Sequence, residues 1–440
     1  MYPKKIVASL LLRSLFGVSL FACSNLSAQM PDALSATTFS SVLGKEPAGS
    51  LTLSAAIDFA LASNPELSAA DNELRAIEGV VLQAGALPNP EISTSVEDTQ
   101  NKATRTTSIQ LSQRIELGGK RSARIASAER WRDVATADLA AKRLDVRATV
   151  TAAFFDVLVA QERVQQAEDL LRLAQRVSQA TSRRVVAGKI SPVEETKARV
   201  AEASARVELN QAQRELLTTR KRLAASWGSS MPRFDKAEGR TEILPALRSA
   251  EDIDSSLNSS PALLRARHEM ERFSALADLE RARRIPDVTV SLGSKKAEEI
   301  GRNQTTVGLS MPFPIFDRNR GNVLEAQRRA DKARDELVAA ELRLGTEVAQ
   351  NQERLRALVV EAQTLQDEIV PGARSAYEAA SKGFELGKFS FLEVLDAQRT
   401  FFQARAQYLR SLSDAHRTAA ELERILGSVD STPSNVLSRP

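Results

Sequence analysis

Residues that bind metals or act as nucleophiles are scarce in this chain. Its 440 residues include two histidines, His268 and His416, and one cysteine, Cys23. The histidines are isolated on predicted helices, and no group of His, Cys and Asp has the spacing of a metal-ligand set. The sequence also lacks a glycine-rich phosphate loop and a paired nucleophile and base. We therefore expect no enzyme activity, no metal site and no cofactor.

Four carboxylates are notable because they lie at the end of, or just after, two similar turn sequences, GKISPVE at 188–194 and GKFSFLE at 387–393. If copies of the chain meet around an axis, these acids form rings that attract cations and hold a pore shut through bonds to basic neighbours. The alternative is that they are first-turn acids that stabilise a helix N-terminus. The candidate aperture residues are Glu194, Glu195, Glu393 and Asp396.

The two turns belong to a duplication of most of the chain. Four further pairs of segments match at nearly the same offset, which is too long for a solenoid repeat and indicates a duplicated structural unit. We assign the repeats to 51–228 and 251–427, with an extension at 29–50, a linker at 229–250 and a disordered tail at 428–440. The matching pairs are Asn64–Leu67 with Ser260–Leu263, Pro90–Ile92 with Pro286–Val288, Ser108-Ile109 with Thr306-Val307, and Trp227-Gly228 with Leu426-Gly427.

Residues 1–28 have the pattern of a secretory signal peptide. Lys4-Lys5 precede a short apolar run from Leu10 to Ala22, which is too short to span a bilayer as a helix. Two cleavage sites remain open. Cleavage before Cys23 would give a lipoprotein with Cys23 lipidated, and cleavage after Ala28 would give an ordinary secreted protein.

The composition predicts long helices. Ala, Leu, Arg, Glu, Gln and Val dominate, aromatic residues are few, and basic residues alternate with acidic ones instead of forming a nucleic-acid surface. We expect one long helix at 118–187, roughly 100 Å in length at ~1.5 Å per residue. Its coiled-coil seam has alternating spacings of four and three. The seam residues are Val146, Val150, Ala153, Val157, Ala160, Val164, Ala167, Leu171 and Ala174.

The remaining helical segments match this rod in pairs. Segments 51–86 and 192–227 are each about half as long as the 118–187 helix. In the second repeat we expect a long helix at 320–386, bent at Pro371-Gly372, because proline cannot continue the backbone hydrogen bonding of a helix. The turns at 187–192 and 386–391 connect each long helix to the segment that follows it.

Each repeat also contains a predicted β-hairpin, at 90–117 and 286–314. Apolar and polar residues alternate with period two along strands of roughly nine to eleven residues, the length that crosses a bilayer at a tilt. The alternative is a half-buried hairpin in a soluble α+β domain. The apolar face comprises Ile92, Val96, Ile109, Leu111, Ile115, Leu117, Val288, Val290, Leu292, Val307, Leu309, Met311 and Phe313.

Four strands are too few to close a barrel, and unpaired edges cannot remain in hydrocarbon. The chain must therefore form oligomers, and three copies would supply twelve strands.

The duplication, the hairpins and the turns at 184–191 and 383–390 resemble the TolC-type outer-membrane efflux family over 51–427. The resemblance implies a mainly α fold with membrane β-strands: a trimeric 12-stranded outer-membrane β-barrel continuous with a periplasmic α-helical barrel. It also implies that the linker 229–250 is an equatorial segment and that the turns are periplasmic tips that dock an adaptor protein. The alternative is that the tips serve only as turns, in which glycine ends the long helix in the left-handed conformation and serine caps the helix that follows. The implied docking residues are Gly188, Lys189, Ser191, Gly387, Lys388 and Ser390.

The segment IELGGKR at 115–121 is similar to one in the heavy-metal (CzcC-like) branch of that family. This resemblance implies the outer-membrane channel of a tripartite RND-type system that exports divalent cations such as cobalt, zinc and cadmium. Its partners would be two further copies of the chain, a periplasmic adaptor, an inner-membrane RND pump and outer-membrane lipid, with no nucleic acid. A simpler interpretation is that Gly118-Gly119 only makes a strand-to-helix bend. The alternative functions are a channel for drugs or other small molecules and a soluble periplasmic coiled-coil adaptor.

Overall fold

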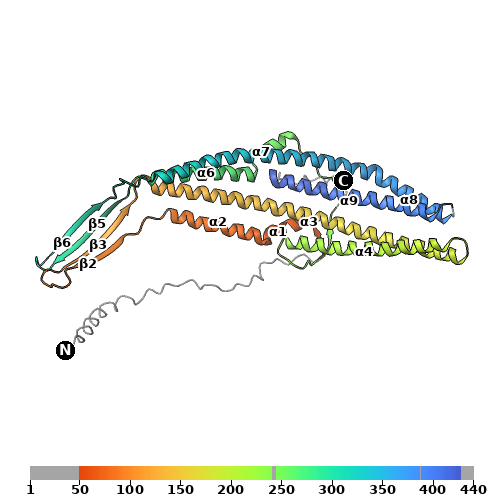
Figure 1. The fold of residues 1–440 in the computed structure, drawn as a ribbon, viewed down its shortest axis with the longest axis horizontal. Coiled ribbons are helices and arrows are strands. Elements are labelled where there is room, and N and C mark those ends of the chain that lie inside the picture. The colour runs from red at the N-terminus through yellow and green to blue at the C-terminus, as the bar shows by residue number, and fades with distance from the viewer. Residues whose placement is uncertain (1–48, 240–243, 387, 428–440) are drawn as a thin grey trace, which may run out of the picture. The chain divides into compact units, whose positions relative to one another are not determined.

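The computed structural model describes residues 49–239, 244–386 and 388–427, all within one compact unit, Lys45–Pro440. The predicted signal peptide, Cys23, most of the 29–50 extension, Gly387 and the 428–440 tail lie outside the described residues. The structure confirms a mainly helical, duplicated chain with two β-hairpins (Figure 1).

The first repeat contains two short helices, a hairpin, a long helix and a half-length helix, and the second repeat follows the same order. The elements of the first half are β1 (Gly49–Thr52), α1 (Leu53–Ser63), α2 (Pro65–Ala84), β2 (Glu91–Glu97), β3 (Thr106–Ile115), α3 (Lys120–Val186), α4 (Pro192–Ala225) and β4 (Phe234–Glu238). Those of the second are α5 (Ala250–Asn258), α6 (Pro261–Ala282), β5 (Val288–Ala297), β6 (Arg302–Ser310), α7 (Arg320–Thr364), the π-helical turn η1 (Leu365–Ile369), α8 (Val370–Glu385) and α9 (Phe391–Leu426).

The segment expected at 51–86 is divided into two helices at Asn64. The Asn64 side chain accepts hydrogen bonds from the backbone N–H groups of Glu66 (2.8 Å) and Leu67 (3.0 Å), and Pro65 occupies the first position of α2. Ser260 caps α6 in the equivalent way, ahead of Pro261. The repeated X-Pro pair is therefore a helix start in both copies, because an N-cap acceptor and a proline at the first position both favour helix initiation.

The two hairpins form one antiparallel sheet in the order β2-β3-β5-β6. Its register aligns Ile92, Leu111, Leu292 and Val307 across all four strands, and the adjacent row is Ser93, Gln110, Gly293 and Thr306. Because neighbouring residues of a strand point to opposite faces, one face is apolar and the other polar, as the alternation predicted. The strands β2 and β6 are the edges of this sheet.

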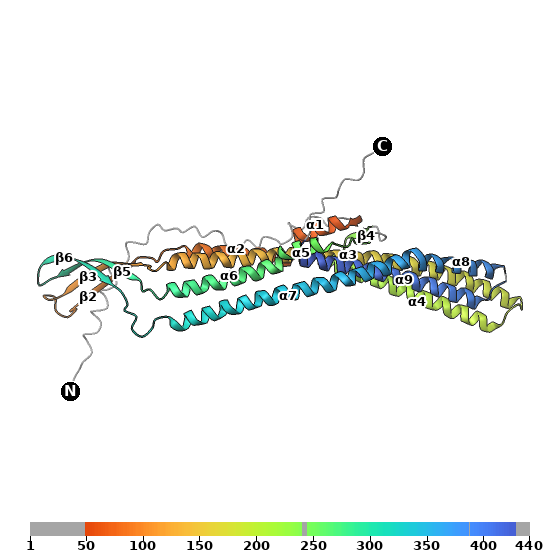
Figure 2. The ribbon, with the colours of Figure 1, turned by 90° about the horizontal axis from the view of Figure 1, so that it is seen from above.

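The helix α3 is the central element of the helical layer. It packs against α2 and α6 along one part of its length and against α4 and α9 along another (Figure 2). Seven of the nine predicted seam residues are buried, and Val164 and Leu171 are partly buried. Alanine at many of these positions allows the close helix packing that the spacing predicted.

The second long helix contains an irregularity one turn before the expected bend. The turn η1 ends with a hydrogen bond from the Val370 N–H to the Leu365 carbonyl, which spans five residues instead of four. Pro371 follows at once and lacks an N–H, and its ring would crowd a carbonyl in an uninterrupted α-helix. The wider turn accommodates that proline without ending the helix.

The linker expected at 229–250 contains a strand that the sequence analysis did not predict. In this segment β4 pairs in parallel with β1, with Leu51 opposite Ala237. Beside this pair, Trp227 is fully buried, and its ring contacts Phe59 (centroid distance 5.7 Å) and Phe234 (6.2 Å) edge-on. Through these contacts the end of the first repeat packs against its beginning.

Within the described chain, each helix is too short or too polar to cross a lipid bilayer.

Candidate docking tips and the strand-to-helix junction

The first tip has the hydrogen bonding of a helix C-terminus that ends in a left-handed glycine. Gly188 has φ +65°, its N–H donates to the Val185 carbonyl (2.9 Å), and the Lys189 N–H donates to the Arg184 carbonyl (2.9 Å). This is a Schellman motif, which satisfies the last carbonyls of the helix. Ser191 then caps α4 by accepting from the Val193 N–H (3.3 Å). Both local roles match the sequence analysis.

The second tip closes in a related way. The Lys388 N–H donates to the Gly383 carbonyl (2.8 Å), and Ser390 caps α9. A Cβ on Gly383 would overlap the ring of Phe389, so the ring lies directly against the backbone of α8. Gly387 lies outside the described residues.

The four predicted aperture acids differ in their contacts. Glu393 completes a capping box, because its carboxylate accepts the Ser390 N–H (2.6 Å); this hydrogen bond lowers the pKa of Glu393. Glu194 forms an ion pair with Lys197 (3.0 Å) and Glu195 with Arg199 (2.5 Å), each within α4. Asp396 is exposed, and within the described chain no ion pair involves its side chain.

The two tips are in contact within one chain. The Arg184 guanidinium lies over the Phe384 ring, 4.6 Å from its centroid, and donates to the Phe384 carbonyl (3.4 Å). Beneath this contact Val177 and Ala198 are buried, with Leu395 packed against them. The sequence analysis did not predict that these residues would meet.

A groove of about 1350 Å³ lies next to the tips, between α4 and α9, and residues of α3 form its base. Asp396 lines it together with Gln166 and Gln398, whose buried side-chain nitrogens have no hydrogen-bond partner among the described residues. Farther along the groove, Asp156 on α3 accepts two hydrogen bonds from Arg417 on α9 (2.9 and 3.1 Å). This ion pair fixes the spacing of α3 and α9 at the groove wall.

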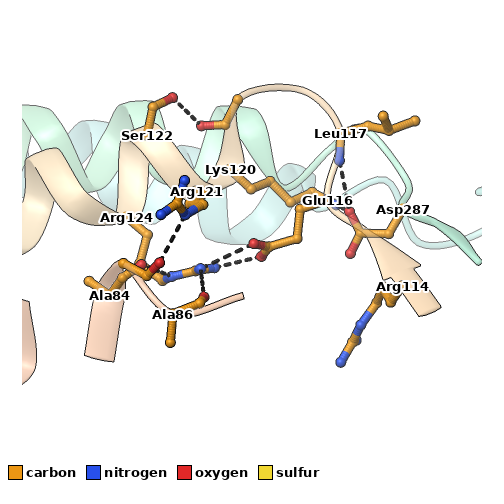
Figure 3. A network of polar contacts seen from close by, with 12 residues as sticks. Ala84, Ala86, Arg114, Glu116, Leu117, Lys120, Arg121, Ser122, Arg124 and Asp287 are labelled. Atoms are coloured by element: carbon orange, nitrogen blue, oxygen red, sulfur yellow. Dashed lines mark hydrogen bonds and ion pairs between the residues drawn. The ribbon is translucent and has the colours of Figure 1, made fainter. Parts of the chain in front are cut away.

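The 115–121 segment builds the junction between the sheet and the helices (Figure 3). Arg124 makes two hydrogen bonds to Glu116, at 2.6 and 3.1 Å, and donates to the carbonyls of Ala84 (2.8 Å) and Ala86 (3.1 Å). Arg121 donates to the Gly85 carbonyl (2.9 Å). Two arginines of α3 therefore bind the carbonyls at the C-terminus of α2, where a helix end favours cations.

Lys120 and the two glycines complete this junction. Lys120 forms an ion pair with Asp287 (2.5 Å), which also accepts the Leu117 N–H (3.3 Å). Gly118 and Gly119 have φ +70° and +72°, and a Cβ on Gly118 would lie 2.7 Å from the Ile285 side chain. The glycines turn the chain from β3 into α3 where a side chain does not fit. The observed contacts of this segment are thus structural.

The two hydrogen bonds between Arg124 and Glu116 shift the pKa values of both side chains. The Arg124 hydrogen bond lowers the pKa of Glu116, and the Glu116 hydrogen bond raises the pKa of Arg124. The Glu116 side chain is 12% exposed and that of Arg124 30%. Both groups therefore remain charged at neutral pH in a position largely shielded from solvent.

No metal-binding cluster of three or more His, Cys, Asp or Glu residues occurs between residues 49 and 427 where the structure describes the chain. His268 lies 3.4 Å from Glu271 on α6, and His416 on α9 stacks on Phe155 with ring centroids 3.5 Å apart. The structure does not bring the two histidines together. At the junction, sequence reasoning missed Arg124 and Asp287, and the signal for them was their nearness to the ends of predicted strands.

Comparison with known proteins identifies relatives along almost the whole chain. The cobalt-zinc-cadmium resistance protein CzcC of Cupriavidus metallidurans is 48% identical over 391 residues, which cover 89% of this chain and 93% of that protein. The nickel-cobalt-cadmium resistance protein NccC of Alcaligenes xylosoxydans is 28% identical over 295 residues, covering 65% of this chain and 64% of that protein.

Solved structures share the fold at lower identity. A membrane protein from Pseudomonas aeruginosa superposes with a TM-score of 0.74 at 20% identity, covering 86% of this chain and 90% of that one. The open state of the MtrE outer membrane channel of Neisseria gonorrhoeae gives 0.73 at 19% identity, covering 86% and 89%. The model of the outer membrane efflux protein family matches residues 56–229 and 253–428, one match in each repeat, and the chain therefore belongs to this family.

Proposed function

We propose that this protein is the outer-membrane channel of a tripartite efflux system and that it exports divalent heavy-metal cations such as cobalt, zinc and cadmium. The observation that carries the cargo assignment is the 48% identity to a cobalt-zinc-cadmium resistance protein along nearly its full length. The protein is a passive conduit and not an enzyme. A wide conduit does not need to bind its cargo, so the assignment requires no metal site in the wall.

The sheet supports a homotrimer. Both β2 and β6 are edges, and their unpaired N–H and C=O groups would be costly in hydrocarbon. Pairing β6 of one copy with β2 of the next satisfies these groups, and three copies give twelve strands. The apolar row of Ile92, Leu111, Leu292 and Val307 then faces lipid, and the polar row faces the lumen.

The tips are the proposed docking site for a periplasmic adaptor that connects the channel to an inner-membrane pump. Lys189 and Lys388 are exposed, one at each tip, next to the exposed apolar side chains of Val186 (87%) and Leu386 (64%). A protein interface has an apolar core and a polar rim, and these apolar side chains with the lysines beside them would supply both. Gly188, Ser191 and Ser390 shape these turns, and Gly387 belongs to the same proposed set.

Asp396 is the strongest of the four aperture candidates. Glu194, Glu195 and Glu393 are engaged in contacts on their own helices, whereas Asp396 is exposed and lines the groove above the tips. Three copies of this carboxylate around a trimer axis would form an acidic ring that attracts cations.

Growth of a deletion strain tests both the conduit and its cargo. Cells are grown on gradients of zinc, cadmium, cobalt and nickel and on a panel of hydrophobic drugs, with wild type or Lys189→Glu/Lys388→Glu supplied in trans. We expect sensitivity to metals alone, rescued by wild type and not by the double variant. The matched control is Lys332→Glu/Lys221→Glu, which reverses two lysine charges away from the tips and should rescue fully. Sensitivity to drugs alone would overturn the cargo, and rescue by the tip variant would overturn lysine-dependent docking.

A further inference from the structure

A second groove, of about 770 Å³, lies where the sheet joins α6 and α7. It is lined by three arginines, Arg281, Arg284 and Arg318, and by Ile285, Phe313 and Ile315. Among the described residues, no carboxylate contributes to its lining. Ile285 also lies against Gly118 in the junction, but the three arginines have no role in that junction or in the function proposed above.

The charges of this groove are only partly neutralised. Arg281 forms an ion pair with Asp278 (2.6 Å). The Arg318 Nε donates to the Pro314 carbonyl (3.3 Å), but within the described residues neither Arg318 nor Arg284 has a carboxylate partner. Both side chains belong to exposed residues, so their guanidinium groups can bind an anion through paired N–H donors.

The apolar half of the groove continues the apolar face of the sheet. Phe313 follows Val307, Leu309 and Met311 at alternate positions, three residues after β6 ends, and is 80% exposed. The neighbouring Ile315 and Phe316 are 55% and 98% exposed. Figure 2 shows the backbone of the connection from β6 to α7. Apolar side chains of this connection lie beside cationic ones in the lining of the groove.

The position of the groove suits a membrane surface. A ten-residue strand such as β5 extends roughly 33 Å at ~3.3 Å per residue, about the thickness of a bilayer core when tilted. The helix-proximal end of the sheet then lies at the headgroups of the periplasmic leaflet. Outer-membrane barrels carry girdles of aromatic residues at this depth, and arginine packs its apolar stem on hydrocarbon while its charged end stays at the polar surface.

We propose that this groove binds the headgroup of an anionic phospholipid from the periplasmic leaflet. The phosphate contacts Arg284 and Arg318, and the first part of an acyl chain packs on Phe313 and Ile315. The proposal rests on the proposed function, which places the sheet in the outer membrane. A lipid bound there would hold the β6–α7 connection at the membrane surface.

Native mass spectrometry of the purified protein in detergent tests the assignment, with phosphatidylglycerol and phosphatidylcholine as probes. We expect wild type to retain phosphatidylglycerol preferentially. Arg284→Gln/Arg318→Gln should weaken this binding roughly 25-fold, about fivefold for each arginine near a lipid phosphate. Arg284→Lys/Arg318→Lys should retain most of it, which separates loss of charge from loss of folding.

The matched control is Arg328→Gln/Arg334→Gln, which removes two exposed arginines of α7 outside the groove. Equal weakening by this pair, or no preference of wild type for phosphatidylglycerol, would overturn the proposal. So would equally tight binding of water-soluble glycerol phosphate, because the apolar half would then have no role. If wild type binds no lipid and Phe313→Ser dissociates the oligomer, a neighbouring copy covers the groove instead.

Recovery of the wild-type protein in the outer membrane and its rescue of metal resistance are measured separately from lipid binding. Failure of either measurement would overturn the proposed function, whatever the result for lipid binding.

Discussion

Arg124 binds Glu116 through two hydrogen bonds, of 2.6 and 3.1 Å, across the turn that converts β3 into α3. The same guanidinium donates to two carbonyls at the end of α2. One side chain therefore connects a strand end, a helix start and a helix end, at the place where the sheet meets the helices. Bidentate arginine contacts of this kind impose geometry as well as attraction.

Arg124→Gln should lower the free energy of unfolding by about 2–3 kcal/mol, because it leaves a shielded carboxylate without its cation and two carbonyls without their donor. Thermal unfolding of the purified protein measures the loss. Arg130→Gln is the control on the same helix: its ion pair with Glu271 is about half exposed and should contribute less than ~1 kcal/mol. Equal effects of the two substitutions would contradict a special role for Arg124.

The Glu116–Arg124 pair predicts a specific acid sensitivity. The Arg124 hydrogen bond lowers the pKa of Glu116 below its ordinary value of 4.5. A carboxyl whose folded-state pKa is depressed stabilises the protein above its unfolded-state pKa, and this contribution is lost as pH falls through the folded-state pKa. The difference in unfolding temperature between wild type and Glu116→Gln should thus be full at pH 7 and shrink below about pH 4.5. A difference that is constant from pH 7 to pH 3 would refute this.

Two glycines with similar backbone angles should respond unequally to alanine. Gly118→Ala combines a φ of +70° with a Cβ 2.7 Å from the Ile285 side chain, and should cost about 2–4 kcal/mol. Gly188→Ala has φ +65° but open space around its Cβ, and should cost about 1 kcal/mol. Denaturation of both variants compares them, and Ile285→Ala should restore part of the loss in Gly118→Ala. Failure of that rescue would show that the close approach is not the cause.

The sequence predicted those features that short-range chemistry determines. Alternation with period two places Ile92, Leu111, Leu292 and Val307 on one face whatever the neighbouring strands do, and the register aligns them. Gly188 and Ser191 end and start helices through contacts with residues at most five positions away. These predictions required no knowledge of tertiary structure.

Features formed by distant segments were not predictable in this way. The pairing of β1 with β4 brings Leu51 opposite Ala237, and neither short strand has an alternation that distinguishes it from a loop. Arg184 meets Phe384 across two hundred positions of sequence. The division between α1 and α2 at Asn64 could have been predicted, since an N-cap residue before a proline is a helix-start signal. The match between the two repeats did not by itself identify this helix start.

The contact of Gly383 with Phe389 leads to a prediction about the second tip. A Cβ at Gly383 would overlap the Phe389 ring, so Gly383→Ala should displace the ring and the turn beside it. We expect loss of metal resistance in a growth assay with a normal amount of oligomer in the outer membrane, because the change is confined to the tip. Gly383→Ala/Phe389→Ala relieves the overlap and tests whether space or the ring itself is required.

Gly345→Ala is the control: its Cβ meets nothing within 4 Å in the middle of α7, and it should stabilise the helix by up to about 1 kcal/mol without affecting resistance. Full resistance in Gly383→Ala would show that the shape of this tip is not used in docking.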